Sequence, residues 1–225
     1  MPRIARSVFP NIPHHITQRG NRREDVFFTD NDRLIYLEWL EFYCEKNDVS
    51  VLSYCLMTNH IHLVVLPHSE DGLQKVLKPL HMRYSQHINK IKAWTGHLWL
   101  GRFFSSPLDD AYTWSTIRYV ERNPIQAGMV IKAEDYRWSS AAAHCGLKAE
   151  PLLATLPNSM DGISPEDWSD WLAVSESKAV TDIIQRNIEK GLPCGNDNFI
   201  DKLERVAKRA LRYKPQGRPF KENKG

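Results

Sequence analysis

The stretch Val49–Leu66 reads VSVLSYCLMTNHIHLVVL, and its pattern decides the fold. Both halves are rich in β-branched and aromatic residues, and the polar pair Thr58-Asn59 separates them. Such residues favour strands, and a short polar link between two strands predicts an antiparallel hairpin. We therefore expect strands at 49–57 and 60–66, joined by a tight turn.

The segments on both sides of this hairpin supply the rest of a sheet and its helices. Helical spacing of apolar residues, capping residues and strand-like runs indicate where each element begins and ends. The predicted elements are a strand at 14–19, a helix over 31–46 capped by Thr29 or Asp30, a helix over 71–92 that Pro79 should kink or split, a strand around 102–106 and a helix from 111 to 123. The order β-α-β-β-α-β-α predicts an α+β fold, a ferredoxin-like antiparallel sheet with helices on one face.

The C-terminal third has a different character. No convincing strand follows Trp138, residues 164–212 have the pattern of two or three helices, and 214–219 (KPQGRP) has the composition of a flexible tail. The chain therefore divides into a core domain at 1–146, a helical extension at 147–212 and a basic tail at 213–225. We find no internal repeat.

Charge is distributed unevenly along the 225 residues. Residues 1–23 carry five arginines and no acid, and residues 201–225 carry nine basic and three acidic residues, within a chain of net charge +3. The remaining 177 residues therefore sum to −8, because 3 − 5 − 6 = −8. Basic ends on an acidic body are typical of a protein that binds a polyanion, and solvated tails would give the same count.

Composition excludes several classes of protein. An apolar content of 42% excludes a wholly disordered chain. No apolar run is long enough for a membrane span or a signal peptide, so membrane and secreted proteins are disfavoured. The cysteines are far apart, without a CxxC pair, which argues against a disulfide scaffold or a cysteine zinc site and favours the cytoplasm. They are Cys44, Cys55, Cys145 and Cys194.

Two short patterns carry possible chemistry. In the strand beginning His60-Ile61-His62, alternation places both imidazoles on one face, about 7 Å apart, where they could share a divalent cation. Tyr119 and Asn123 are four residues apart and would share one face of a helix. The spacing alone favours a structural interpretation, with one histidine at the surface and the other hydrogen-bonded to a neighbour, a core tyrosine, and an asparagine that ends a helix before Pro124.

Together these residues resemble a known family. The segment Asn59–Val64 resembles the HUH motif of single-strand DNA nucleases, and with Tyr119 downstream the chain is similar to single-tyrosine transposases of small insertion sequences. It resembles their REP-associated tyrosine transposase relatives more closely. The supporting stretches lie within about residues 1–146 and are Arg19–Arg23 (RGNRR), Gly96–Phe103 (GHLWLGRF), Tyr119–Pro124 (YVERNP) and Trp138–Ala141 (WSSA).

The resemblance implies roles for particular residues. Residues 1–146 would be the catalytic domain, in which His60, His62 and Asn123 bind Mg²⁺ or Mn²⁺ and Tyr119 is the nucleophile. The expected activity is a DNA transposase or single-strand DNA endonuclease that forms a 5′-phosphotyrosine at single-stranded or hairpin DNA ends. Relatives include monomers and homodimers, so either state is expected. The chain contains no Walker A or GxGxxG sequence, in keeping with chemistry that needs no nucleotide cofactor.

Several basic and aromatic residues are candidates for holding DNA. The expected phosphate contacts in the core are Arg19, Arg22, Arg23, Arg102 and Arg118, although the first three would equally suit a solvated loop. The tail contains a Gly-Arg-Pro core that resembles an AT-hook, with Lys214, Arg218 and Lys221 as its cations, and it would equally fit a basic tail that anchors duplex DNA without sequence preference. The aromatics before and within the last predicted strand would stack on unpaired bases or fill the core, and they are Trp94, Trp99, Phe103 and Phe104.

Two other functions fit the same residues. One is a non-catalytic, domesticated DNA- or RNA-binding protein on the same fold. The other is a metal-dependent phosphodiesterase that uses water as the nucleophile and leaves Tyr119 in the core. A covalent band between the protein and an oligonucleotide would separate these alternatives from the transposase.

Overall fold

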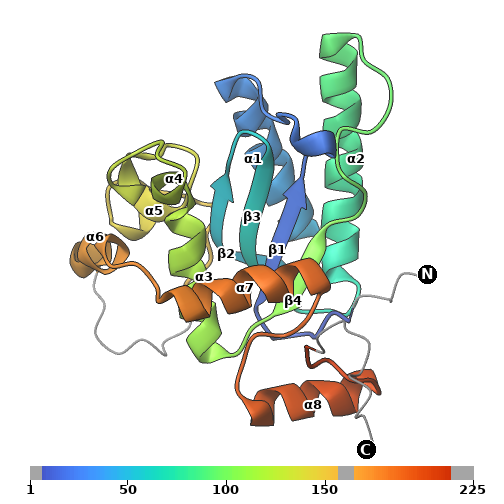
Figure 1. The fold of residues 1–225 in the computed structure, drawn as a ribbon. Helices are drawn as coiled ribbons and strands as arrows, with labels where there is room; N and C mark the ends of the chain where they lie inside the picture. Colours follow the sequence, from blue (N-terminus) through green and yellow to red (C-terminus); the bar gives the residue numbers. More distant parts are fainter. Residues whose placement is uncertain (1–6, 157–164, 214–225) are drawn as a thin grey trace, which may run out of the picture.

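A computed structural model describes residues 7–156 and 165–213 of the chain. Four strands form one antiparallel sheet in the order β2-β3-β1-β4 (Figure 1). They are β1 (His14–Arg19), β2 (Val49–Leu56), β3 (His60–Pro67) and β4 (Phe104–Pro107). The α+β class, the hairpin and the antiparallel sheet are therefore confirmed, and β4 begins two residues later than predicted.

The first two long helices follow the sequence pattern. α1 (Asp30–Lys46) begins with a capping box in which Thr29 accepts from the Asp32 amide and the Asp32 carboxylate accepts from the Thr29 amide. α2 (Gly72–Lys92) is one uninterrupted helix, so the prediction that Pro79 would split it is wrong. The apolar stripe of α2 is buried along its length, and this burial outweighs the roughly 3 kcal/mol that an interior proline costs.

The next helix ends earlier than predicted. α3 (Asp110–Glu121) begins with the Asp109 side chain accepting from the Tyr112 amide, and the four-residue α4 (Asn123–Gln126) follows it. The helix therefore ends two residues before the expected end at about Asn123. Pro124 has no amide hydrogen and stands at the first turn of α4, where a missing donor is tolerated.

The C-terminal part is helical, as expected. The helices α6 (Pro165–Ala173), α7 (Lys178–Lys190) and α8 (Asp197–Ala207) fall within the predicted 164–212. Shorter elements are two 3₁₀ turns at Asn21–Arg23 and Ala133–Asp135 and a helical turn, α5, at Ala141–His144. Within the ranges that the structure describes, no helix is long and apolar enough to cross a membrane.

The helices form two layers around the sheet. α1 and α2 cover one face and α3 and α7 lie over the opposite face (Figure 1), so the expectation that helices cover only one face is wrong. The core between the sheet and the helices is largely inaccessible to solvent and includes Ile16, Tyr36, Leu40, Ile61, Leu63 and Tyr84. Trp168, Leu172 and Ile184 from the predicted extension join the same buried cluster. The extension thus packs against the core domain, and the boundary at residue 146 stays a prediction.

Candidate active site

The two histidines of the His-x-His pattern lie side by side on the α3 face of the sheet. Their ring centroids are 5.0 Å apart. The register places Arg19 opposite His60 and Thr17 opposite His62 on β1. Nδ1 of His60 is hydrogen-bonded to Asn59 Oδ1 at 2.6 Å, so Nε2 is the nitrogen that His60 can offer to a ligand.

His62 is positioned by a residue that the sequence did not reveal. His62 is only 5% exposed, and its Nδ1 lies 2.9 Å from Nε2 of His15 on β1. The two rings are stacked, with centroids 5.2 Å apart. This contact fixes the orientation of the His62 ring and leaves its Nε2 for a ligand. Alternation along β1 places His15 on the same face as Thr17. Only the register between β1 and β3 brings His15 to His62.

Tyr119 completes the cluster from α3. Its ring is perpendicular to that of His62, with centroids 5.7 Å apart, and 6.0 Å from the ring of His15. Asn123 begins α4, and its Nδ2 donates to the backbone oxygen of Tyr119 at 2.9 Å. The structure therefore brings His60, His62 and Tyr119 together and ties Asn123 to the tyrosine, as the spacing predicted, although a helix break separates the last two.

Burial controls the protonation of the site. Burial, together with the charge of Arg19, lowers the pKa of His60 to about 4. Burial also lowers the pKa of His62 well below its ordinary value, and the neighbouring His15 and His60 add to this effect. Both rings are therefore neutral at neutral pH, which is the form that binds metal ions. Burial raises the pKa of Tyr119, and hydrogen bonding by Gln185 and Asn123 acts in the opposite direction.

Gln185, a residue of α7, is a second contributor that sequence reasoning missed. Its Nε2 donates to the phenolic oxygen of Tyr119 at 3.5 Å, and Tyr119 is only 7% exposed. The helix pattern of residues 178–190 gave no sign of this contact, because it depends on α7 crossing the sheet beside α3 (Figure 1).

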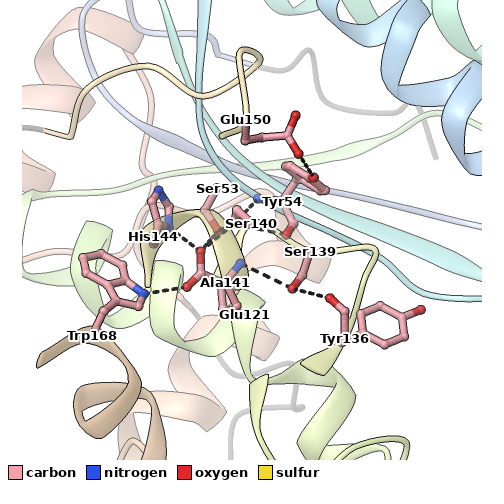
Figure 2. Close-up of polar contacts among 10 residues, drawn as sticks. All are labelled: Ser53, Tyr54, Glu121, Tyr136, Ser139, Ser140, Ala141, His144, Glu150 and Trp168. Carbon is pink, nitrogen blue, oxygen red and sulfur yellow. Dashed lines mark hydrogen bonds and ion pairs between the residues drawn. The ribbon is translucent and has the colours of Figure 1, made fainter. Parts of the chain in front are cut away.

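A buried carboxylate anchors the helix that carries the tyrosine. Glu121 is fully buried two residues after Tyr119, and Figure 2 shows it at the centre of a polar cluster. It accepts hydrogen bonds from Trp168 Nε1 at 2.9 Å, from the Ser140 hydroxyl and, more weakly, from Ser53 at 3.4 Å, and Nδ1 of His144 lies 2.6 Å away. These partners come from β2, α5, α6 and the residue before α5, so Glu121 ties α3 to elements on several sides.

Comparisons with known proteins show the family of the chain. The family model described as "Transposase IS200 like" matches residues 8–123, just over half of the chain. The chain belongs to the IS200-like transposase family. That match includes both histidines, the tyrosine and the asparagine of the site.

Two solved structures are similar to this transposase. One is a REP-associated tyrosine transposase bound to a REP hairpin, with 13% identity and a TM-score of 0.55 over 70% of this chain and 100% of the other. At 13% identity, this similarity shows that the two chains share a fold. The other is the crystal structure of a Deinococcus radiodurans protein that is named as a candidate transposase. It has 16% identity and a TM-score of 0.38 over 53% of this chain and 96% of the other. A search of curated proteins finds no match.

The predicted DNA contacts of this IS200-like transposase fall into three groups. Arg19 is half-buried beside His60, and Arg22, Arg23 and Arg102 are exposed. Arg118 is half-buried, its Nε donates to Glu176 at 2.7 Å and its guanidinium lies over the Trp171 ring. The pairing with Glu176 argues against a phosphate contact by Arg118. Lys214, Arg218 and Lys221 lie outside the described residues.

The loop that carries the exposed arginines depends on a close backbone approach. A Cβ on Gly20 would lie 2.1 Å from the Glu24 carbonyl oxygen, so only glycine fits there. Arg22 and Arg23 then adopt left-handed backbone angles, with φ of 54° and 63°. This turn directs the chain away from β1 and leaves both arginine side chains in solvent.

The aromatics near β4 have different environments. Trp99 and Phe103 are buried, which confirms the core interpretation for these two. Trp94 and Phe104 are exposed by 48% and 39%. Of the two, Trp94 contacts the Phe28 ring, with centroids 5.5 Å apart.

Proposed function

We propose that this transposase is a metal-dependent nuclease that cleaves single-stranded or hairpin DNA ends by transesterification through Tyr119. The observation that carries the proposal is the contact between the Tyr119 ring and the ring of His62, with His60 alongside. This contact supports a role for Tyr119 as the nucleophile, because the phenol lies next to two neutral imidazoles that each offer one nitrogen. The similar structure bound to a REP hairpin supports DNA with a hairpin as the substrate class.

The donor set of the site fits a divalent ion. In residues 7–156 and 165–213, no three His, Cys, Asp or Glu side chains are arranged to hold a metal. A metal would therefore need a ligand of another type, and the amide oxygen of Asn123 would supply one in addition to Nε2 of His60 and His62. Mg²⁺ or Mn²⁺ held there would polarise the scissile phosphate and stabilise the charge that develops on it.

In the proposed reaction, Tyr119 takes the phosphoryl group from the DNA strand. The phenolic oxygen of Tyr119 forms a bond to phosphorus while the bond from phosphorus to the 3′ oxygen breaks. The phenol proton passes to water, and the departing 3′ oxygen takes a proton from water, which leaves a 5′-phosphotyrosine and a free 3′-OH. Gln185 and Asn123 favour the phenolate by hydrogen bonding. The phosphodiester energy is retained in the intermediate, so a DNA 3′-OH can reverse the step.

The test is a denaturing gel that detects a covalent band between the protein and a labelled hairpin oligonucleotide with single-stranded flanks. With Mg²⁺ or Mn²⁺ the native protein should give the band, and Tyr119→Phe should lose both the band and strand cleavage while still binding DNA. Tyr112→Phe is a matched control, because Tyr112 is a half-buried tyrosine on the same helix.

Each alternative function gives a different result in this assay. Cleavage at the native rate by Tyr119→Phe would contradict the assignment of the nucleophile and favour attack by water. DNA binding without cleavage under any metal condition would favour a non-catalytic binding protein. Full activity in excess chelator, or in His62→Ala, would exclude the metal site.

A further inference from the structure

Phe104, on the active-site face of the sheet, differs from the other exposed aromatic side chains in its contacts. The exposed aromatic residues of the described chain are Phe42, Trp94, Phe104 and Tyr213. Three of them contact another ring or a cation: Phe42 lies against Tyr43, Trp94 against Phe28, and Tyr213 against Arg186. Phe104 is the one that lies in a strand, and no aromatic or cation contact to it is found among the described residues.

The strand register places Phe104 on the same face as the catalytic cluster. Phe104 on β4 pairs with Thr17 on β1, and Thr17 pairs with His62 on β3. Residues directly opposite one another in an antiparallel sheet point to the same face. Phe104 therefore lies two strand spacings, about 10 Å, from His62. Thr17 between them is small, and its hydroxyl donates to the Ile61 carbonyl at 2.9 Å.

The two ends of β4 differ in how far other parts of the chain cover them. At one end the chain after α7 covers the strand, because Ser106 donates to the Leu192 carbonyl and the Cys194 amide donates to the Pro107 carbonyl. At the other end Phe104 stays open to solvent. An open phenyl ring on an edge strand is unfavourable in water and promotes association between sheets, so a bound partner would stabilise it.

We infer that Phe104 is a stacking platform for an unpaired base of the DNA strand that enters the active site. This inference rests on the proposed function, since it places the base next to the phosphate that Tyr119 would attack. A separation of about 10 Å corresponds to roughly three nucleotides at the 3.4 Å rise of stacked DNA. Arg19 on the same face and the exposed Arg22 beyond it supply positive charge for the backbone of that strand.

The chemistry of the platform selects single strands without reading their sequence. Every base has a flat π-face that can stack on a phenyl ring, whereas a base inside a duplex has both faces covered by its neighbours. Phe104 should therefore contribute to binding of single-stranded DNA and contribute little to binding of a blunt duplex.

The experiment compares affinities for a fluorescent dT12 strand and for a blunt duplex of the same length. The proteins also carry Tyr119→Phe, so that no cleavage occurs. Phe104→Ala should weaken dT12 binding by about 5- to 150-fold, and Phe104→Trp should restore it to within about threefold of the parent. Leu100→Ala is the control, because Leu100 is an exposed apolar residue that precedes β4. It should bind dT12 like the parent.

A second measurement identifies the contact directly. In a dT12 strand that carries one 5-iododeoxyuridine, irradiation should crosslink the strand to the peptide that contains Phe104. Unchanged dT12 affinity in Phe104→Ala, or an equal loss for dT12 and duplex, would overturn the inference. The outcome is separable from the proposed function, because loss of dT12 affinity in Phe104→Ala, together with no covalent adduct from the protein that keeps Tyr119, would retain the platform and reject the nuclease.

Discussion

Replacing the buried carboxylate of Glu121 tests how the tyrosine helix is held. Glu121 is inaccessible to solvent and accepts hydrogen bonds from four side chains on neighbouring elements (Figure 2). Glu121→Ala removes all four bonds at once and leaves the donors inside the protein. We expect a large loss of stability and, because Tyr119 is two residues away on α3, a loss of strand cleavage as well.

The size of the effect follows from which donors can find another acceptor. The Ser140 hydroxyl lies 3.3 Å from the Tyr54 carbonyl and can turn to it. Trp168 Nε1 and His144 Nδ1 have no such second contact among the described hydrogen bonds. A buried donor without a partner costs about 1–3 kcal/mol, so Glu121→Ala should lower the free energy of unfolding by about 2–6 kcal/mol. Glu121→Gln keeps one acceptor oxygen and should cost about 1–3 kcal/mol.

Urea unfolding, followed by circular dichroism, measures these differences. Glu38→Ala is the control, because Glu38 is an exposed carboxylate within α1, and it should change the free energy by less than about 0.5 kcal/mol. A double-mutant cycle with Trp168→Phe isolates one bond, and the combined loss should be smaller than the sum of the single losses by about 1–3 kcal/mol. If Glu121→Ala unfolds like Glu38→Ala, or if the cycle shows no coupling, the reasoning about this network is refuted.

Three further predictions concern the loop, a buried histidine and the arginines. Gly20→Ala should lower the free energy of unfolding by about 1–3 kcal/mol in urea, because its Cβ would meet the Glu24 carbonyl; unchanged stability would contradict this. Burial lowers the pKa of His14 to about 4, so below pH 6.5 the unfolded state takes up a proton that the fold excludes. His14 alone should therefore lower the stability by about 3 kcal/mol between pH 6.5 and 4, in addition to the contributions of the other buried histidines, and the decline in urea titrations of His14→Gln should be smaller by about that amount. Arg22→Ala should reduce the salt slope of single-strand binding by about 0.7, whereas Arg118→Ala should leave that slope unchanged.

Local patterns were sufficient for most of the elements. The β-branched run around His60-Ile61-His62 and the capping residue Thr29 placed a strand and a helix within about a residue of their ends. Two errors have a common cause. Pro79 was expected to kink or split α2, and α3 was expected to continue to about Asn123. Both outcomes depend on how the helix packs and ends rather than on propensity alone.

The candidate site was predictable only in part. Alternation along β3 paired His60 with His62, and a four-residue spacing linked Tyr119 to Asn123. The contact of His15 with His62 could not be predicted, because it needs the register of two strands 47 residues apart. The ion pair of Arg118 could not be predicted for the same reason. Its partner Glu176 is remote in the chain, so a cation that looked free is paired within the fold.

The sequence by itself determined the residue types of the chemistry, the identity of the strands and helices, and the family to which they point. These properties depend on short-range periodicity, which a single chain segment carries. Only the tertiary structure decided which side chains meet. It brings His15 to His62, Gln185 to Tyr119 and Trp168 to the carboxylate of Glu121. It also leaves Phe104 exposed on the same face of the sheet as the histidines. These contacts join segments far apart in the chain, and burial then sets the protonation of the groups they bring together.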